Sequence, residues 1–112
     1  FYRGKSFDTF CPISSVTSAA MVKNPQALRL TATLNGRLMQ DSNTSDMVFS
    51  VARLIAEASR GTTLLPGTLI LTGTPSGVGF ARNPAIFMKD GDEIAIEVEG
   101  LGVLKNRVKA EA

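Results

Sequence analysis

The dipeptide Asn35-Gly36 constrains the fold of this chain more than any other short feature, because it separates two segments that look like strands. In residues 28–34 apolar side chains alternate with polar ones, as on a half-buried strand. Residues 37–40 follow the pair directly and are expected to form the returning strand. Asn-Gly is typical of the type I′ turn, whose twist matches that of two antiparallel strands. The sequence therefore predicts a β-hairpin with its turn at residues 35–36.

A helical periodicity follows the hairpin. Its apolar members are Met47, Val48, Val51, Leu54, Ile55 and Ala58, and its charged members on the opposite face are Arg53, Glu57 and Arg60. Thr44 or Ser45 can cap the first turn, and Asp46 suits the positive end of the helix dipole. Arg60-Gly61 suits the other end. We expect one principal helix over this stretch.

The rest of the chain has the character of strands and connections. Residues 5–11 are expected to be extended until Pro12 stops them, and the serine-rich residues 14–27 to form a connection. Further strands are expected at 69–72, 93–98 and 103–108. One helix among six or so strands predicts a mainly β domain, and the strand pattern alone does not distinguish a sandwich from a barrel.

Composition narrows the function classes. Of the 112 residues, 44% are hydrophobic and 20% charged, which fits one globular domain with a core of modest size. The net charge is +2 and the basic residues are scattered, so nucleic acid is an unexpected partner. No apolar run approaches the roughly 20 residues of a membrane helix. A single cysteine, Cys11, favours a cytoplasmic protein and is expected to be a small buried hydrophobe.

The loop at residues 72–79, Thr-Gly-Thr-Pro-Ser-Gly-Val-Gly, follows an apolar run and holds three glycines and three hydroxyl groups. Glycine permits positive φ and close backbone approach to a ligand, and the hydroxyl and N–H groups can converge on an anionic or carbonyl oxygen. A tight turn between two strands would also explain the composition. The loop is therefore a candidate ligand site with a structural alternative.

The loop gains meaning from the motifs around it. These are Gly4-Lys5-Ser6-Phe7-Asp8-Thr9-Phe10-Cys11-Pro12, Asn35-Gly36, Gln40, Asn43-Thr44-Ser45-Asp46-Met47, Pro66-Gly67, Lys89-Asp90-Gly91-Asp92 and Glu99-Gly100-Leu101-Gly102. In this order the set resembles the C-terminal part of the catalytic domain of the fumarylacetoacetate hydrolase family, in its branch of 2-hydroxyhepta-2,4-diene-1,7-dioate isomerases and acylpyruvases. The resemblance implies a mixed β-sandwich roll, with residues 1–112 as the C-terminal portion of a single domain that is incomplete at its N-terminus.

The resemblance also implies site residues. Lys5 and Thr74 would be catalytic and would bind substrate together with Gly73, and Thr9 is a possible contact of a second cation. A partly desolvated lysine can hold a carboxylate and stabilise a developing enolate. Gln40 and the residues 43–46 are expected to serve hydrogen bonding and helix capping instead.

The implied cofactor is Mg²⁺ or Mn²⁺, held by carboxylates that precede Gly4 in the family. Glu97-Val98-Glu99 has the spacing of a ligand pair, but it matches ordinary surface carboxylates of the family, so no metal ligand set is expected in this chain. The implied partners are a small oxo-acid substrate, the N-terminal portion of the enzyme or a companion chain, and a second copy in a homodimer.

The reaction stays open among C–C hydrolysis, decarboxylation and isomerisation through a metal-stabilised enolate. The alternative is a non-catalytic β-rich remnant or structural subunit that lacks the metal site and is stable on its own core. The chain has no histidine, which excludes a Ser-His-Asp or Cys-His arrangement within it. Gly4-Lys5-Ser6 lacks the following helix of a phosphate-binding loop, and Gly73, Gly77 and Gly79 lack dinucleotide-binding spacing.

Overall fold

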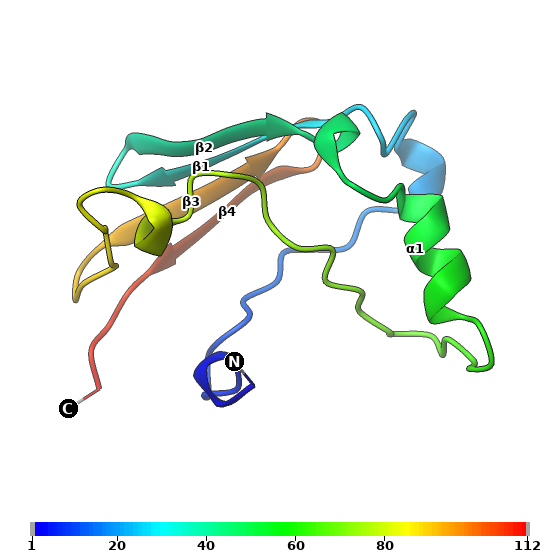
Figure 1. Ribbon diagram of the computed structural model, residues 1–112, viewed down its shortest axis with the longest axis horizontal. Coiled ribbons are helices and arrows are strands. Elements are labelled where there is room, and N and C mark those ends of the chain that lie inside the picture. The colour runs from blue at the N-terminus through cyan, green and yellow to red at the C-terminus, as the bar shows by residue number, and fades with distance from the viewer. Residues whose placement is uncertain (1, 112) are drawn as a thin grey trace.

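A computed structural model describes residues 2–111 of the chain, and its centre is an open, four-stranded antiparallel sheet (Figure 1). The strands are β1 (Arg29–Leu34), β2 (Arg37–Asn43), β3 (Glu93–Val98) and β4 (Gly102–Arg107). Their order across the sheet is β2-β1-β3-β4, so the hairpin β1-β2 and the hairpin β3-β4 join side by side. The mainly β fold with one principal helix is confirmed.

The turn between β1 and β2 has the predicted geometry. Asn35 and Gly36 both have positive φ, at 50° and 78°, as a type I′ turn requires. The Asn35 side chain also ties this turn to the neighbouring hairpin: its amide donates to Asp92 Oδ1 at 2.8 Å and its oxygen accepts from the Glu93 N–H at 2.9 Å. The Asn35 side chain therefore joins the turn of the β1-β2 hairpin to the start of β3.

Strand β2 contains a β-bulge that later positions the site. Ala32 pairs with Gln40, whereas the next residue, Thr33, pairs with Leu38. Met39 is therefore an extra residue that has no opposite number on β1. A bulge disrupts the ladder locally and re-aims the side chains beside it. At this point the Met39 carbonyl is bonded by the side chain of Arg82.

The principal helix, α1 (Val51–Ala58), is shorter than the periodicity predicted. Its N-cap is Ser50, whose hydroxyl accepts from the Arg53 N–H, so the predicted start near Met47 and the predicted capping by Thr44 or Ser45 were wrong. The helical pattern of apolar residues begins earlier because the short 3₁₀ turn η3 (Thr44–Asp46) precedes α1 and carries its own cap. At the far end Gly61 takes a φ of 71°, in keeping with the predicted stop.

Two predicted strands are not strands. Residues 3–5 form one 3₁₀ turn, η1 (Arg3–Lys5), and a second turn follows in which the Phe10 N–H donates to the Phe7 carbonyl at 3.1 Å. Local backbone bonds replace a ladder there, and Thr9 and Cys11 have positive φ, at 67° and 60°. Residues 69–72 also lie outside the sheet, so the described residues contain four strands instead of six or so. The prediction that Cys11 is buried was wrong as well, since its side chain is exposed.

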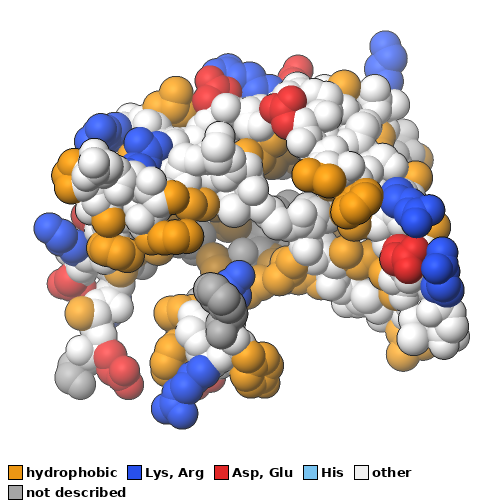
Figure 2. All heavy atoms as spheres, in the orientation of Figure 1, with side chains coloured by type: hydrophobic (Ala, Val, Ile, Leu, Met, Phe, Trp, Pro, Cys, Tyr) orange, Lys and Arg blue, Asp and Glu red, His pale blue; other side chains and the backbone are white. Residues whose placement is uncertain are grey.

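The apolar side chains of this piece are largely uncovered. Ala32, at 6% exposure, is the one buried hydrophobic residue among those described, and Phe80 and Phe87 are 73% and 66% exposed. The surface measures 9300 Å², whereas a folded monomer of 11.9 kDa is expected to expose roughly 6,000 Å². Figure 2 shows hydrophobic side chains gathered around a hollow below the sheet. The modest core predicted from composition is therefore missing from residues 2–111.

Two more short turns complete the chain, η2 (Ala19–Met21) and η4 (Gly79–Ala81). Within residues 2–111, no helix has the length and apolar character needed to cross a membrane.

Candidate functional site

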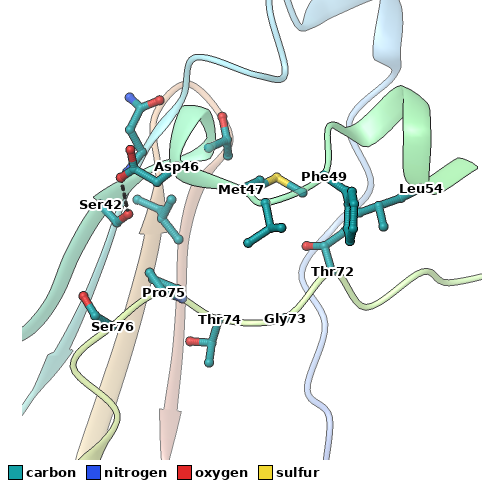
Figure 3. A pocket seen from close by; sticks show the side chains of 14 residues that line it. Ser42, Asp46, Met47, Phe49, Leu54, Thr72, Gly73, Thr74, Pro75 and Ser76 are labelled. Atoms are coloured by element: carbon teal, nitrogen blue, oxygen red, sulfur yellow. Dashed lines mark hydrogen bonds between the residues drawn. The ribbon is translucent and has the colours of Figure 1, made fainter.

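The glycine-rich loop forms one wall of a pocket of about 500 Å³. The opposite wall comes from the end of β2, from η3 and from the segment that leads into α1 (Figure 3). The lining residues are Leu30, Ser42, Asn43, Thr44, Asp46, Met47, Val48, Phe49, Leu54, Thr72, Gly73, Thr74, Pro75 and Ser76. The loop that the sequence singled out thus lines an open pocket, together with apolar residues such as Met47 and Leu54 that the sequence had assigned only to a helix.

Gln40 holds this loop in place. Its amide nitrogen Nε2 lies 3.0 Å from Thr74 Oγ1, 2.8 Å from the Pro75 carbonyl oxygen and 3.2 Å from the Ser76 carbonyl oxygen. Two of these three partners are carbonyl oxygens, which only accept, so the atom that faces them must be the nitrogen. Gln40 follows the bulged Met39, and the bulge therefore aims the anchor of the loop. The predicted hydrogen-bonding role of Gln40 is confirmed.

Arg82 makes a second attachment of the loop to β2. Its Nε donates to the Gly77 carbonyl at 3.1 Å, and its Nη2 donates to the Met39 carbonyl. The guanidinium thus joins the carbonyl that the bulge displaces to the carbonyl of a loop glycine. Arg82 was not predicted as a site residue, because nothing in the order of residues shows that Met39 forms a bulge.

The three loop glycines differ in what a side chain at each position would contact. A Cβ at Gly77 would approach the Met39 carbonyl oxygen closer than 3.0 Å, and one at Gly79 would do the same with the Ile86 carbonyl oxygen. Gly73, with a φ of 96°, would meet nothing within 4 Å. Gly77 and Gly79 are therefore required by packing inside the chain, and Gly73 is the loop glycine whose backbone stays open to a ligand.

Thr74 is exposed, and its hydroxyl oxygen accepts the hydrogen bond from Gln40. Figure 3 shows its side chain leaving the loop on the side opposite to Asp46 and Met47. Thr72 leaves the loop on the other side, near Phe49. The loop therefore presents hydroxyl groups in two directions, and the Thr74 hydroxyl lies apart from the nearest pocket carboxylate.

Lys5 lies in η1 and is exposed, and Thr9 lies in the turn that follows. The structure does not bring either residue to the pocket, since neither belongs to the lining of the cavity. Within residues 2–111 no hydrogen bond joins the Lys5 side chain to another group. The roles assigned to Lys5, Thr9, Gly73 and Thr74 therefore stay predictions.

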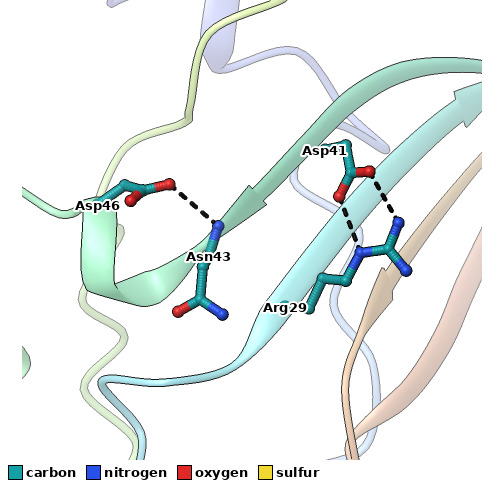
Figure 4. A network of polar contacts seen from close by, with 4 residues as sticks. All are labelled: Arg29, Asp41, Asn43 and Asp46. Carbon is teal, nitrogen blue, oxygen red and sulfur yellow. Dashed lines mark hydrogen bonds and ion pairs between the residues drawn. The ribbon is translucent and has the colours of Figure 1, made fainter.

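The carboxylates near the pocket are engaged by the protein itself (Figure 4). Asp46 accepts from the Ser42 hydroxyl at 2.8 Å and from the Asn43 N–H at 3.3 Å, and these two bonds hold the pKa of Asp46 below its usual range. The Asn43 side chain in turn accepts from the Ser45 N–H, which completes a capping box over η3. The predicted capping role is therefore confirmed for Asn43 and Asp46 on η3, whereas Thr44 and Ser45 do not cap α1.

Asp41 is held in a similar way. Arg29 grips it with two bonds, Nε to Oδ1 at 2.9 Å and Nη2 to Oδ2 at 2.7 Å, which lowers the pKa of Asp41. Both side chains are exposed, so the pair contributes little to stability but fixes the carboxylate against β1.

The described residues do not fit a divalent metal. No three acidic, histidine or cysteine side chains come together among them. Glu99 of the Glu97-Val98-Glu99 pair accepts a hydrogen bond from the Arg29 N–H at 3.1 Å, which is a structural use of this carboxylate. Mg²⁺ and Mn²⁺ need several converging oxygen ligands, so residues 2–111 hold no complete set of acidic, histidine or cysteine ligands by themselves.

Comparisons with known proteins show the family of this chain. Residues 1–109 match the family model described as "Fumarylacetoacetate (FAA) hydrolase C-terminal". A mitochondrial oxaloacetate tautomerase FAHD2B from Bos taurus is 49% identical over 106 residues, which are 94% of this chain and 34% of that protein. The chain thus spans about a third of the length of the curated relatives it matches.

Two solved structures are similar in fold as well. A fumarylacetoacetate hydrolase from Exiguobacterium antarcticum superimposes with a TM-score of 0.92 at 41% identity, over 97% of this chain and 39% of that one. A maleylpyruvate hydrolase from Sphingobium sp. SYK-6, in complex with a manganese(II) ion and pyruvate, gives a TM-score of 0.75 at 37% identity, over 84% of this chain and 33% of that one.

Proposed function

Because the chain belongs to the fumarylacetoacetate hydrolase family and matches its C-terminal part, we propose that it supplies part of the active site of an enzyme that acts on a small oxo-acid. The observation that carries the proposal is the anchored loop, in which Gln40 fixes Thr74 beside the open backbone of Gly73. Such an arrangement offers donors to a carboxylate or an enolate oxygen. Named relatives that act on such molecules are the oxaloacetate tautomerase and the maleylpyruvate hydrolase.

The proposed chemistry passes through an enolate. Loss of a proton from the carbon beside the keto group places negative charge on the keto oxygen, and the Thr74 hydroxyl and loop N–H groups would donate to oxygens that carry this charge. The Lys5 ammonium group would pair with the substrate carboxylate. Protonation of this enolate on oxygen or carbon completes an oxo–enol interconversion, whereas in decarboxylation or hydrolytic C–C cleavage the enolate is the group released as the C–C bond breaks. We favour the oxo–enol interconversion of a 2-oxo-dicarboxylic acid, because the relative with 49% identity is named for it.

The cofactor we propose is a divalent cation, Mg²⁺ or Mn²⁺, with ligands outside residues 2–111. The support is the manganese ion in the maleylpyruvate hydrolase complex. A chelator is expected to abolish the activity of the complete protein, and addition of either ion to restore it.

We also propose that the remaining portion of a family-length protein, or a companion chain, covers the exposed apolar side chains. The support is a surface about half as large again as a folded monomer of this mass requires. The same observation opposes a remnant that is stable on its own core. Residues 1–112 expressed alone should therefore bind hydrophobic dyes and show no amides protected from hydrogen exchange. The complete protein should bind little dye and show protected amides.

Two further expectations stay proposals. A homodimer would give twice the chain mass in sedimentation equilibrium of the complete protein. The cytoplasmic location is open to question, because the bovine relative is named as mitochondrial.

The test of the function uses the complete protein and compares Thr74→Val with Thr63→Val. Thr63 is an exposed threonine outside the pocket lining and serves as the matched control. Removal of one oxyanion donor typically costs about 10²–10³ in rate, so Thr74→Val should lower kcat/KM for oxaloacetate or an acylpyruvate by that factor while Thr63→Val leaves it unchanged. Equal activity of the two variants would refute the role of Thr74, and an inactive wild-type protein on all of these substrates would refute the reaction class.

A further inference from the structure

We propose that Gln40 is a positioning residue that turns the Thr74 hydroxyl into a donor for substrate. This inference rests on the proposed function and deepens it. It starts from the hydrogen bond in which Gln40 Nε2 donates to Thr74 Oγ1 at 3.0 Å.

The direction of that bond follows from its neighbours. Nε2 also lies 2.8 Å from the Pro75 carbonyl oxygen and 3.2 Å from the Ser76 carbonyl oxygen. Carbonyl oxygens cannot donate, so the atom that faces them is the amide nitrogen, whose two N–H groups are shared among three acceptors and which cannot itself accept. The Thr74 oxygen is therefore the acceptor in its bond with Gln40.

A threonine hydroxyl has one hydrogen to donate and two lone pairs that accept. With one lone pair engaged by Gln40, the hydrogen of Thr74 is left for another acceptor. Within residues 2–111 the one side-chain hydrogen bond of Thr74 is the one it accepts from Gln40. The Thr74 side chain is exposed, so that acceptor can be a bound molecule.

The chemistry of the ligand follows from this polarity. A hydroxyl presented as a donor favours an oxygen that only accepts, such as a carboxylate or an enolate oxygen, over a neutral hydroxyl or amine group. The bulge at Met39 and the grip of Arg82 on the Met39 and Gly77 carbonyls hold Gln40 and the loop in register. Gln40 thus acts on substrate through the loop, and chiefly through the Thr74 hydroxyl.

The test is a set of double-mutant cycles in the complete protein, measured as kcat and KM for the substrate that the wild type turns over. Gln40→Met removes the donor and keeps the length of the side chain. A misplaced catalytic group can cost about 10²-fold, so we expect kcat/KM to fall by roughly 10–100-fold, mostly in kcat. In the Thr74→Ser background, which keeps the hydroxyl, the loss should be the same. In the Thr74→Val background it should vanish.

Gln26→Met is the matched control. Gln26 is another glutamine that bonds backbone groups, since its Nε2 donates to the Thr44 carbonyl at 2.6 Å and its Oε1 accepts from the Val51 N–H at 2.9 Å. Its effect on kcat/KM, if any, should be equal in all three Thr74 backgrounds. A Gln40→Met loss that persists unchanged in the Thr74→Val background would overturn the inference, because Gln40 would then act only as a structural strut.

A second readout separates this inference from the reaction class. The Gln40 side-chain amide protons should exchange slowly in wild-type protein, and faster in Thr74→Val than in Thr74→Ser. Equal exchange in the two variants would overturn the proposed hydrogen bond even in an active enzyme. A wild-type protein that is inactive on every oxo-acid would instead refute the proposed function, and the catalytic part of this inference with it, whatever the exchange shows.

Discussion

Replacing Gly77 by alanine should test whether the loop truly lies against strand β2. Gly77 has a φ of 100°, and a Cβ there would crowd the Met39 carbonyl oxygen, with Gln40 Cγ at 3.2 Å and Arg82 Nη2 at 3.3 Å. The positive φ costs about 1–2 kcal/mol for a residue with a Cβ. The steric overlap adds about 1–3 kcal/mol, because a backbone carbonyl held by Arg82 cannot move freely. We therefore expect Gly77→Ala to lower the free energy of unfolding of the complete protein by about 2–5 kcal/mol in total.

Two other glycines separate these contributions. Gly67 has a φ of 88° with nothing near its Cβ position, so Gly67→Ala should show the backbone cost alone. Gly79 lacks a positive φ but would collide with the Ile86 carbonyl oxygen, so Gly79→Ala should show the overlap alone. Urea denaturation, followed by circular dichroism, gives the three values under one set of conditions. If Gly77→Ala destabilises the protein no more than Gly67→Ala does, the loop does not pack on the bulge as described.

Three further predictions follow from the same geometry. Gly73→Ala should lower kcat/KM, because its Cβ would enter the open space where a substrate is proposed to approach, while the protein stays folded. An unfolded variant, or a folded one with unchanged kcat/KM, would contradict this. Arg82→Met should lower the free energy of unfolding by about 1–3 kcal/mol, since two carbonyls lose their donor, whereas exposed Arg37→Met should not; thermal melts compare the two. The bonds from Ser42 and Asn43 lower the pKa of Asp46, so its carboxylate stabilises the fold above the ordinary aspartate pKa of about 3.9, and this contribution disappears as the pH falls through the lowered value. Asp46→Asn should flatten the fall in stability in that acid range, as urea midpoints at several pH values would show, and an unchanged slope would contradict it.

Local patterns with a local cause were predictable from the sequence. The Asn35-Gly36 turn formed because both residues tolerate positive φ, and the strand predicted at 93–98 has the bounds of β3. The prediction of an extended strand at residues 5–11 was wrong. An alternating pattern makes a strand only where a neighbouring strand supplies hydrogen-bond partners, and no strand within residues 2–111 pairs with this segment. The helix began later than predicted because Ser50 caps it after a separate 3₁₀ turn.

The candidate site was predictable only in part. The glycine-rich loop was identified by its composition, and its pocket was not, because Met47, Val48 and Leu54 had been assigned to a helix face. Gln40 anchors the loop because of the one-residue bulge at Met39. The bulge is defined by the pairing of β1 with β2, and no sequence pattern indicates it. Composition likewise predicted a core, but burial depends on what covers the sheet, and within this piece only Ala32 among the hydrophobic residues is buried.

The most direct measurement is a crystal structure of the complete protein with pyruvate or oxalate bound. Our account predicts that Thr74 Oγ1 and Lys5 Nζ both lie about 2.7–3.2 Å from ligand oxygens. Gln40 Nε2 should at the same time keep its hydrogen bond to Thr74 Oγ1. A ligand bound elsewhere, or one whose oxygens are reached by neither Thr74 nor Lys5, would contradict the assignment of this chain to the substrate half of the site.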